Sequence, residues 1–146
     1  MGRSPTQDRM IIASRFAEVA AVQDAIVVAA ERCGYGEAHL FAIKLSLEEA
    51  LTNAIKHGNR MDPSRKVTVE YQIDDQQVVI TVCDEGAGFR PNAVPDPTTG
   101  PNLEKPSGRG VMLMRAYMSE IYFNPAGNCV TMIKRRDCQL PHVPCT

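Results

Sequence analysis

The order of apolar patterns along the chain is the feature that most constrains its fold. Apolar residues recur at helical spacing from Phe16 to Ala30, before CGYG at 33–36 ends the helix, and again over about 37–57. Two-residue alternation then predicts strands at 67–73 and 78–82, joined into a hairpin by Asp74-Asp75. Helices that precede strands in this way favour an α+β fold, a two-layer sandwich. Helices would cover one face of a mixed, mostly antiparallel sheet.

Four shorter segments complete the expected elements. An apolar stretch is consistent with an edge strand, VMLMRAYM has the spacing of a short helix, and SEIYF and NCVTMIK predict two closing strands. In the same order, these segments cover residues 8–14, 111–118, 119–123 and 128–134. Before the short helix at 111–118, residues 90–107 contain five of the ten prolines and almost no periodicity. An irregular segment of that length inside a compact domain is usually functional or disordered.

Length and composition exclude several classes of protein. The 146 residues are expected to form one domain, 1–146, with a core at about 10–136 and a flexible polar tail at 137–146. A net charge of −1 argues against a nucleic-acid-binding face. No apolar run reaches the roughly 18 residues of a membrane span, so we expect a cytoplasmic protein without a membrane partner.

The metal-binding and redox residue types form no recognisable framework. The five cysteines are odd in number, scattered, and without CxxC spacing, and the three histidines form no ligand cluster. Reduced, mostly structural thiols are therefore expected in preference to a disulfide framework or a zinc site.

A polar stripe runs along the second predicted helix. Glu49 and Asn53 follow Phe41 and Leu45 at intervals of four, so they continue a face that begins with apolar side chains expected to be buried. The stripe could simply end in solvent. Alternatively, a carboxylate and an amide oxygen one turn apart could face a cleft, where Mg²⁺ accepts oxygen ligands and a carboxylate deprotonates a hydroxyl. Glu48 lies about 100° away around the helix and is the weaker candidate.

Two glycine-containing segments are further candidates. Asp84 follows a buried strand that ends at Cys83, and it precedes Gly86 and Gly88. It could accept a hydrogen bond from the amine of adenine, or simply belong to a polar turn. Gly108 and Gly110 flank Arg109 just before the helix at 111–118, with Ser107 as a possible cap. Free amides at a helix start attract phosphate, and Lys105 and Arg109 would add positive charge there.

These segments occur in an order that resembles the Bergerat-fold ATPases. EALTNAIKHG at 49–58 is similar to the N box of that superfamily, DEGAGF at 84–89 to its adenine-binding box, and SGRGVMLM at 107–114 to its phosphate-binding box. The residues of the first box and the short length of the chain are most similar to those of the anti-sigma-factor serine kinases. The resemblance covers roughly residues 10–136.

The resemblance implies a role for each matching residue. Glu49 would be the general base, Asn53 would coordinate Mg²⁺, and Asp84 would bind the adenine amine of ATP. Gly86 and Gly88 would shape the adenine end, and 90–107 would be a lid over the nucleotide. The phosphates would meet Lys105, Gly108, Arg109 and Gly110. A threonine that the family often places near the adenine has no clear equivalent, and Asn128 and Thr131 both stay open.

The resemblance also implies an activity and partners. The leading hypothesis is a serine/threonine kinase that phosphorylates an anti-anti-sigma (STAS-type) protein, sequesters a sigma factor by partner switching, and forms a homodimer. The alternative is a non-catalytic module that uses ATP as a structural ligand. A conformational ATPase of the topoisomerase or MutL kind is disfavoured, because the transducer domain of that class would not fit in this chain.

Overall fold

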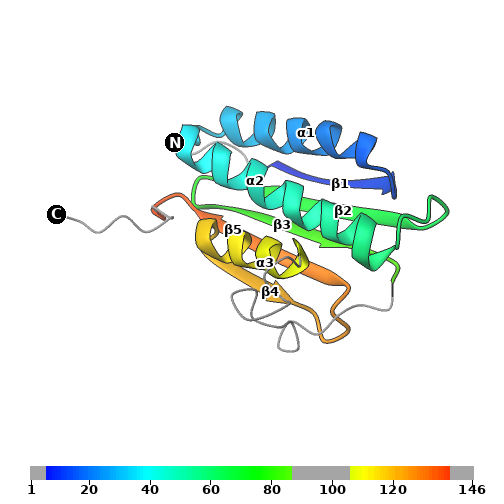
Figure 1. Cartoon of the computed structure of the whole chain (residues 1–146). Coiled ribbons are helices and arrows are strands. Elements are labelled where there is room, and N and C mark those ends of the chain that lie inside the picture. Colours follow the sequence, from blue (N-terminus) through cyan, green and yellow to red (C-terminus); the bar gives the residue numbers. More distant parts are fainter. Residues whose placement is uncertain (1–5, 87–105, 139–146) are drawn as a thin grey trace.

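The computed structural model describes residues 6–86 and 106–138, apart from the side chains of 106–110 (Figure 1). Its helical elements are the 3-10 turn η1 (Phe16–Glu18), α1 (Val19–Arg32), α2 (Glu37–Asn53), the π-helical turn η2 (Ala54–Gly58) and α3 (Pro106–Tyr117). Its strands are β1 (Thr6–Ala13), β2 (Lys66–Ile73), β3 (Gln77–Cys83), β4 (Glu120–Phe123) and β5 (Cys129–Arg135).

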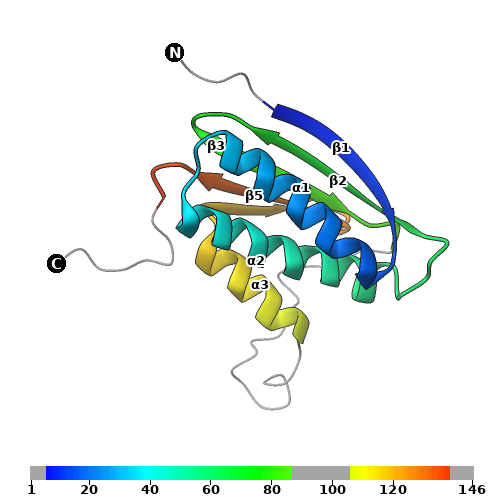
Figure 2. The ribbon, with the colours of Figure 1, turned by 90° about the horizontal axis from the view of Figure 1, so that it is seen from above.

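The strands form one sheet in the order β1-β2-β3-β5-β4, so β1 and β4 are its edges. Every pairing among the described strands is antiparallel, which sharpens the expectation of a mostly antiparallel sheet. The three helices α1, α2 and α3 lie on the same side of this sheet (Figure 2). The predicted α+β sandwich is thereby confirmed, with β1 as the expected edge strand.

The core lies between the helices and one face of the sheet. Alternate residues of the central strands, among them Val69 and Ile80, are fully buried against that layer. Leu47 and Leu51 of α2 are equally buried and come from the apolar face that the helical spacing predicts. Full burial of each such side chain contributes roughly 1.5–3 kcal/mol, so this face fixes how α2 lies on the sheet.

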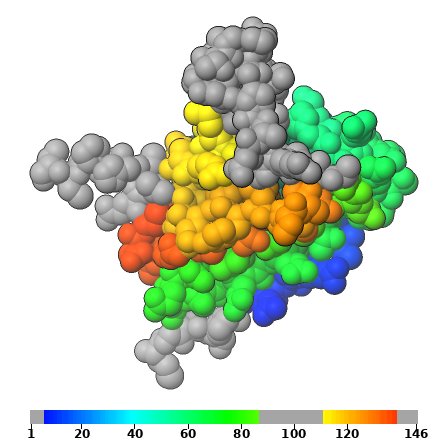
Figure 3. Space-filling view, turned by 90° about the horizontal axis from the view of Figure 1, so that it is seen from below, coloured from blue at the N-terminus to red at the C-terminus, as the bar shows by residue number. Residues whose placement is uncertain are grey.

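No helix among the described residues covers the other face of the sheet (Figure 2). This face bears a hollow of about 680 Å³, and none of the predicted site residues that the structure describes lines it. Its lining residues are Gln7, Asp8, Arg9, Glu70, Tyr71, Gln72, Val79 and Thr81. A view from below shows the two layers edge-on, with α3 in yellow beside β4 in orange (Figure 3). Any site built by the helices therefore lies on the opposite side of the sheet from the hollow.

The helix predicted over 37–57 ends in a way that the sequence does not suggest. The pair Gly58-Asn59 is typical of a left-handed helix stop, but the structure forms none there. Asn59 has φ −89°, and the positive φ angles belong to Arg60 (52°) and Met61 (62°). The chain widens into a π-helical turn instead, in which the N–H of Asn59 bonds to the carbonyl of Ala54 at 2.8 Å. Turns of this kind occur frequently at functional sites.

Two cysteines are joined across the sheet. Cys83 and Cys129 are directly opposed on β3 and β5, and their sulfur atoms form a disulfide. The prediction that the cysteines are reduced is therefore wrong for this pair, whereas Cys33 is a buried free thiol. The physical reason is strand register, which brings together two residues separated by 46 positions in the sequence.

The ends of the predicted segments differ slightly from the structure. Of the lid predicted over 90–107, only the last two positions fall within the described residues, where they begin α3. Asp137 of the predicted tail lies in a turn, which the N–H of Cys138 closes by bonding to the carbonyl of Arg135 at 3.1 Å, and residues 139–146 lie outside the described ranges. Within those ranges, no helix has both the length and the apolar character needed to cross a membrane.

Candidate functional site

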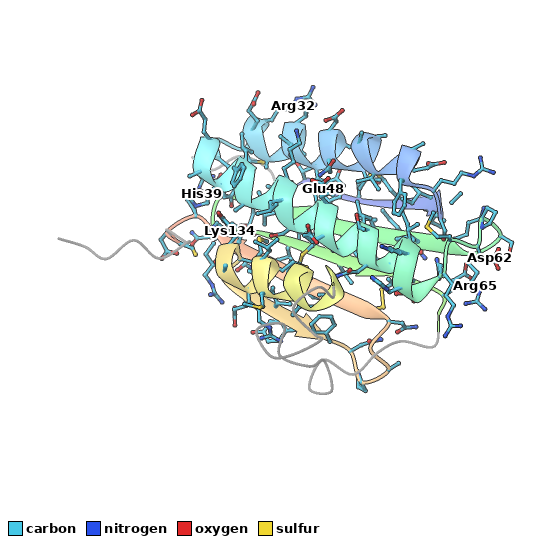
Figure 4. All side chains as sticks on the ribbon, in the orientation of Figure 1. Arg32, His39, Glu48, Asp62, Arg65 and Lys134 are labelled. Carbon is cyan, nitrogen blue, oxygen red and sulfur yellow. A yellow bond between two sulfur atoms is a disulfide. The ribbon has the colours of Figure 1, made fainter. Side chains whose placement is uncertain are left out.

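The polar stripe of α2 lies on the border between the core and the surface. Glu49 and Asn53 are half-buried, whereas Glu48, labelled in Figure 4, is exposed, as the spacing predicts. Phe41, however, is not buried as expected. Its side chain is 57% exposed and meets the ring of Tyr117 edge-on, with the ring centroids 5.7 Å apart. The stripe therefore faces α3 and does not enter the core.

Helices α2 and α3 run in opposite directions, as Figures 1 and 2 both show. The Phe41–Tyr117 contact fixes their alignment at one end of the pair. Asn53 is twelve residues after Phe41, about 18 Å along α2 at 1.5 Å per residue. Eleven residues back from Tyr117 is Pro106, the first residue of α3. The Glu49/Asn53 end of α2 is thus level with the first turns of α3.

The glycine-rich segment lies within α3. The prediction that Gly108 and Gly110 precede the helix, with Ser107 as its cap, is wrong, because α3 begins at Pro106. Proline suits the first helical position, since its fixed φ is helical and its missing N–H would have no partner there. The first N–H groups of a helix have no partner within the helix, and Gly108 is among these positions. Gly88 and Lys105 lie outside the described residues.

Glu49 has an environment that suits a proton acceptor. Partial burial is the main cause that raises the pKa of its carboxyl, and the negative charge of Glu48 raises it further. A carboxylate with a raised pKa holds a proton more readily than one in water. The two glutamates therefore differ in exposure, although they are adjacent in the sequence.

Asp84 follows β3 directly and is held by backbone groups. Its N–H donates to the carbonyl of Asn128 at 2.8 Å, and its carboxylate accepts the N–H of Gly86 at 2.8 Å. Burial raises the pKa of this carboxyl, whereas the bond from Gly86 and the charge of Arg65 lower it. Arg65, labelled in Figure 4, is also paired with Asp62 at 3.8 Å. Asp84 is thus a fixed, half-buried hydrogen-bond acceptor.

Gly58 is a site residue that the sequence reasoning missed. A Cβ at Gly58 would lie 2.3 Å from Oδ2 of Asp84, and a Cβ at Gly86 would lie 1.9 Å from the carbonyl oxygen of Gly58. Neither distance is sterically possible, so both glycines serve close approach. The sequence contains one signal for this role, a glycine just after the polar stripe. A glycine that only ends a helix would give the same pattern, so the sequence does not distinguish the two roles.

The structure also separates the two candidates for the missing threonine. Thr131 is on the uncovered face of the sheet, where its hydroxyl is 2.9 Å from that of Thr81. Asn128 lies beside Asp84 and accepts its N–H through the backbone carbonyl. Of the two, Asn128 is therefore the one at the site.

The donor set fits a nucleotide and a hard cation. Glu49 and Asn53 offer a carboxylate and an amide oxygen one turn apart, and oxygen ligands are what Mg²⁺ accepts. Within the described residues, no three His, Cys, Asp or Glu side chains gather as a metal site. A cation held here would thus depend on few protein ligands and on the phosphates of a nucleotide, a pattern common for Mg²⁺.

Comparison with known proteins identifies the family of the chain. A model of the histidine kinase-like ATPase domain matches residues 12–134. The anti-sigma F factor of Geobacillus stearothermophilus is 37% identical over 105 residues, which cover 68% of this chain and 71% of the relative. The anti-sigma F factor of Geobacillus kaustophilus is 41% identical over 85 residues, and the match spans 58% of that relative's length.

A solved structure has the same fold. It contains the RsbU and RsbW domains of a Mycobacterium tuberculosis protein and matches with a TM-score of 0.61. The match covers 89% of this chain and 32% of that one at 15% identity, so it bears on the fold alone. The three boxes, the sandwich and these matches agree. The chain belongs to the histidine kinase-like ATPase domain family, in its anti-sigma-factor branch.

Proposed function

We propose that this protein is an ATP-dependent serine/threonine kinase that phosphorylates a serine of an anti-anti-sigma (STAS-type) protein. We propose further that it sequesters a sigma factor and exchanges it for the STAS protein by partner switching. The names of the curated relatives, both anti-sigma F factors, support the choice of partners. The half-buried Glu49, one turn before Asn53 and beside the start of α3, is the observation that carries the kinase activity.

Glu49 acts as the general base in this proposal. Its carboxylate accepts the proton of the partner's serine hydroxyl as the serine oxygen bonds to the γ-phosphorus, and ADP leaves with the bridging oxygen. The raised pKa of Glu49 makes it a stronger base than an exposed carboxylate. Asn53 holds Mg²⁺ through its amide oxygen. When bound, Mg²⁺ neutralises charge on the phosphates.

The remaining residues bind and orient ATP. Asp84 accepts a hydrogen bond from the adenine amine, and Gly86 and Gly88 let the ring approach the backbone. Gly108, Arg109 and Gly110 lie in the first turns of α3, where a helix favours phosphate. The N–H of Gly108 has no partner within the helix and can meet a phosphate, and Arg109 adds positive charge. Lys105 adds positive charge, and 90–107 closes over the nucleotide as a lid.

The test is transfer of labelled phosphate from ATP and Mg²⁺ to candidate STAS proteins. Glu49→Gln is expected to lower transfer by about 10²–10⁴-fold while ATP binding persists, which is the usual contribution of a general base. Glu48→Gln is the matched control, because it changes the same residue type at an exposed neighbouring position. This variant is expected to retain transfer.

A different outcome would support the alternative. If ATP binds but no partner serine is ever labelled, the protein is a non-catalytic binding module that responds to ATP. If Glu49→Gln transfers phosphate as well as the wild type, Glu49 is not the base. The homodimer stays a prediction, which light scattering of the purified protein can check.

A further inference from the structure

Asn59 is a buried side chain to which the proposed function gives no role. It follows η2 directly, and none of its surface is exposed. A buried amide costs free energy unless its polar atoms find partners. The partners of Asn59 therefore show what this side chain holds together.

Each polar atom of the Asn59 amide is hydrogen-bonded. Its Nδ2 donates to Oγ of Ser14 at 2.8 Å and to the carbonyl of Lys66 at 2.9 Å. Its Oδ1 accepts the backbone N–H of Glu85 at 2.8 Å. Ser14 is fixed in turn, since its hydroxyl donates to the carbonyl of Arg65 at 2.8 Å. One amide thus connects the end of β1, the start of β2 and the turn that follows β3.

The turn that Asn59 holds is the one that carries the adenine-binding carboxylate. Asp84 is anchored on one side by its N–H bond to Asn128, and Glu85 on the other by its N–H bond to Asn59. The carboxylate of Glu85 also accepts the N–H of Lys66, at the same end of β2. Without Asn59, the peptide after Asp84 would lose its bond to the core.

We infer that Asn59 is a positioning residue that orients the Asp84 carboxylate toward the adenine amine. The inference rests on the proposed nucleotide site. Asn59 itself touches no nucleotide in this account, because its side chain is buried and each polar atom of its amide is bonded to a protein group. Its effect reaches the base through Glu85 and Asp84.

If Asn59 were merely structural, its removal would have the same effects on stability and ATP binding as the removal of any other buried amide. The chain offers a matched control for this comparison. Gln23 on α1 is also buried, and its Nε2 donates to the carbonyl of Lys44 on α2 at 2.9 Å. Neither Gln23 nor Lys44 belongs to the candidate site. Gln23→Ala and Asn59→Ala each remove a buried amide, but only the second removes a bond to the turn after β3.

The experiment measures the dissociation constants of ATP and GTP by calorimetry, together with urea unfolding, for the wild type and both variants. Both variants are expected to lose stability. Only Asn59→Ala is expected to bind ATP about tenfold or more weakly, a loss typical of a misplaced hydrogen bond to a charged group. Its preference for ATP over GTP is expected to narrow, which a loss of stability alone would not cause.

Ser14→Ala is the milder second variant, for use if Asn59→Ala does not fold. It removes one partner of Asn59 and leaves the residue itself in place, so a smaller loss of the same kind is expected. If the wild type binds ATP and these variants keep its ATP affinity and its ATP-to-GTP preference, the role of Asn59 is overturned. The proposed function is then unaffected. If the wild type does not bind ATP, the proposed function is overturned together with it.

Discussion

The backbone of Gly58 lies against the carboxylate of Asp84, so that a Cβ at position 58 would be 2.3 Å from Oδ2 of Asp84. This contact joins the end of the α2 polar stripe to the turn that follows β3. Two segments that are separate in the sequence therefore form one site, and the contact tolerates no side chain at Gly58. The consequences can be measured.

Gly58→Ala is expected to displace Asp84 and weaken ATP binding. Because the added methyl group would overlap the carboxylate, the turn must shift, and overpacking of this kind costs about 1–3 kcal/mol. Calorimetry with ATP and thermal unfolding check both effects. Gly36→Ala is the control, since a Cβ at Gly36 would meet nothing within 4 Å and its φ of −87° suits alanine. Equal effects of the two substitutions would contradict the close-approach role of Gly58.

Glu49→Gln is expected to stabilise the fold at neutral pH. Burial and the charge of Glu48 raise the pKa of Glu49 above its ordinary value of 4.5. The folded state therefore binds the proton more tightly than the unfolded state. The resulting stability is fully present below the unfolded pKa and is lost as pH rises through the folded pKa. Urea unfolding is expected to show a gain for Glu49→Gln at pH 7 that disappears below about pH 4.

Glu48→Gln is expected to shift the pH profile of phosphate transfer. Removal of the neighbouring charge takes away one cause of the raised pKa of Glu49, so the base becomes deprotonated at lower pH. The acidic limb of the profile is thus expected to move toward lower pH, with little change on its plateau. An unmoved limb would mean that a group other than Glu49 controls it.

Reduction of the Cys83–Cys129 disulfide is expected to destabilise the protein by about 2–4 kcal/mol, the usual contribution of such a cross-link. Urea unfolding with and without dithiothreitol measures the difference. A Cys83→Ser, Cys129→Ser double variant is the control, because it should show no response to the reductant while Cys33 and Cys138 remain. A wild type whose unfolding is unchanged by the reductant would contradict the cross-link.

Much of the fold could be predicted because it is encoded locally. The two-residue alternation in β2 and β3 indicates which of their side chains are buried. The apolar face of α2 does the same for the helix. Helical spacing also separates Glu49 from Glu48, since adjacent residues on a helix point about 100° apart. These predictions depended only on neighbours in the sequence.

The errors arose where distant segments meet. The register of β3 against β5 decides that Cys83 opposes Cys129, and nothing near either cysteine reveals it. Phe41 is exposed because it contacts Tyr117 of α3 instead of the core. The role of Asn59 depends on Ser14 and Glu85, which come from opposite ends of the first 86 residues.

Binding of ATP and GTP to the wild type and to Asp84→Asn tests the account most directly. Because burial raises the pKa of Asp84, a neutral asparagine is not expected to unfold the domain. The wild type is expected to bind ATP in preference to GTP, and Asp84→Asn to lose about ten- to a hundredfold in ATP affinity while it remains folded. A folded Asp84→Asn variant with wild-type ATP affinity would contradict the nucleotide site on which the proposed kinase depends.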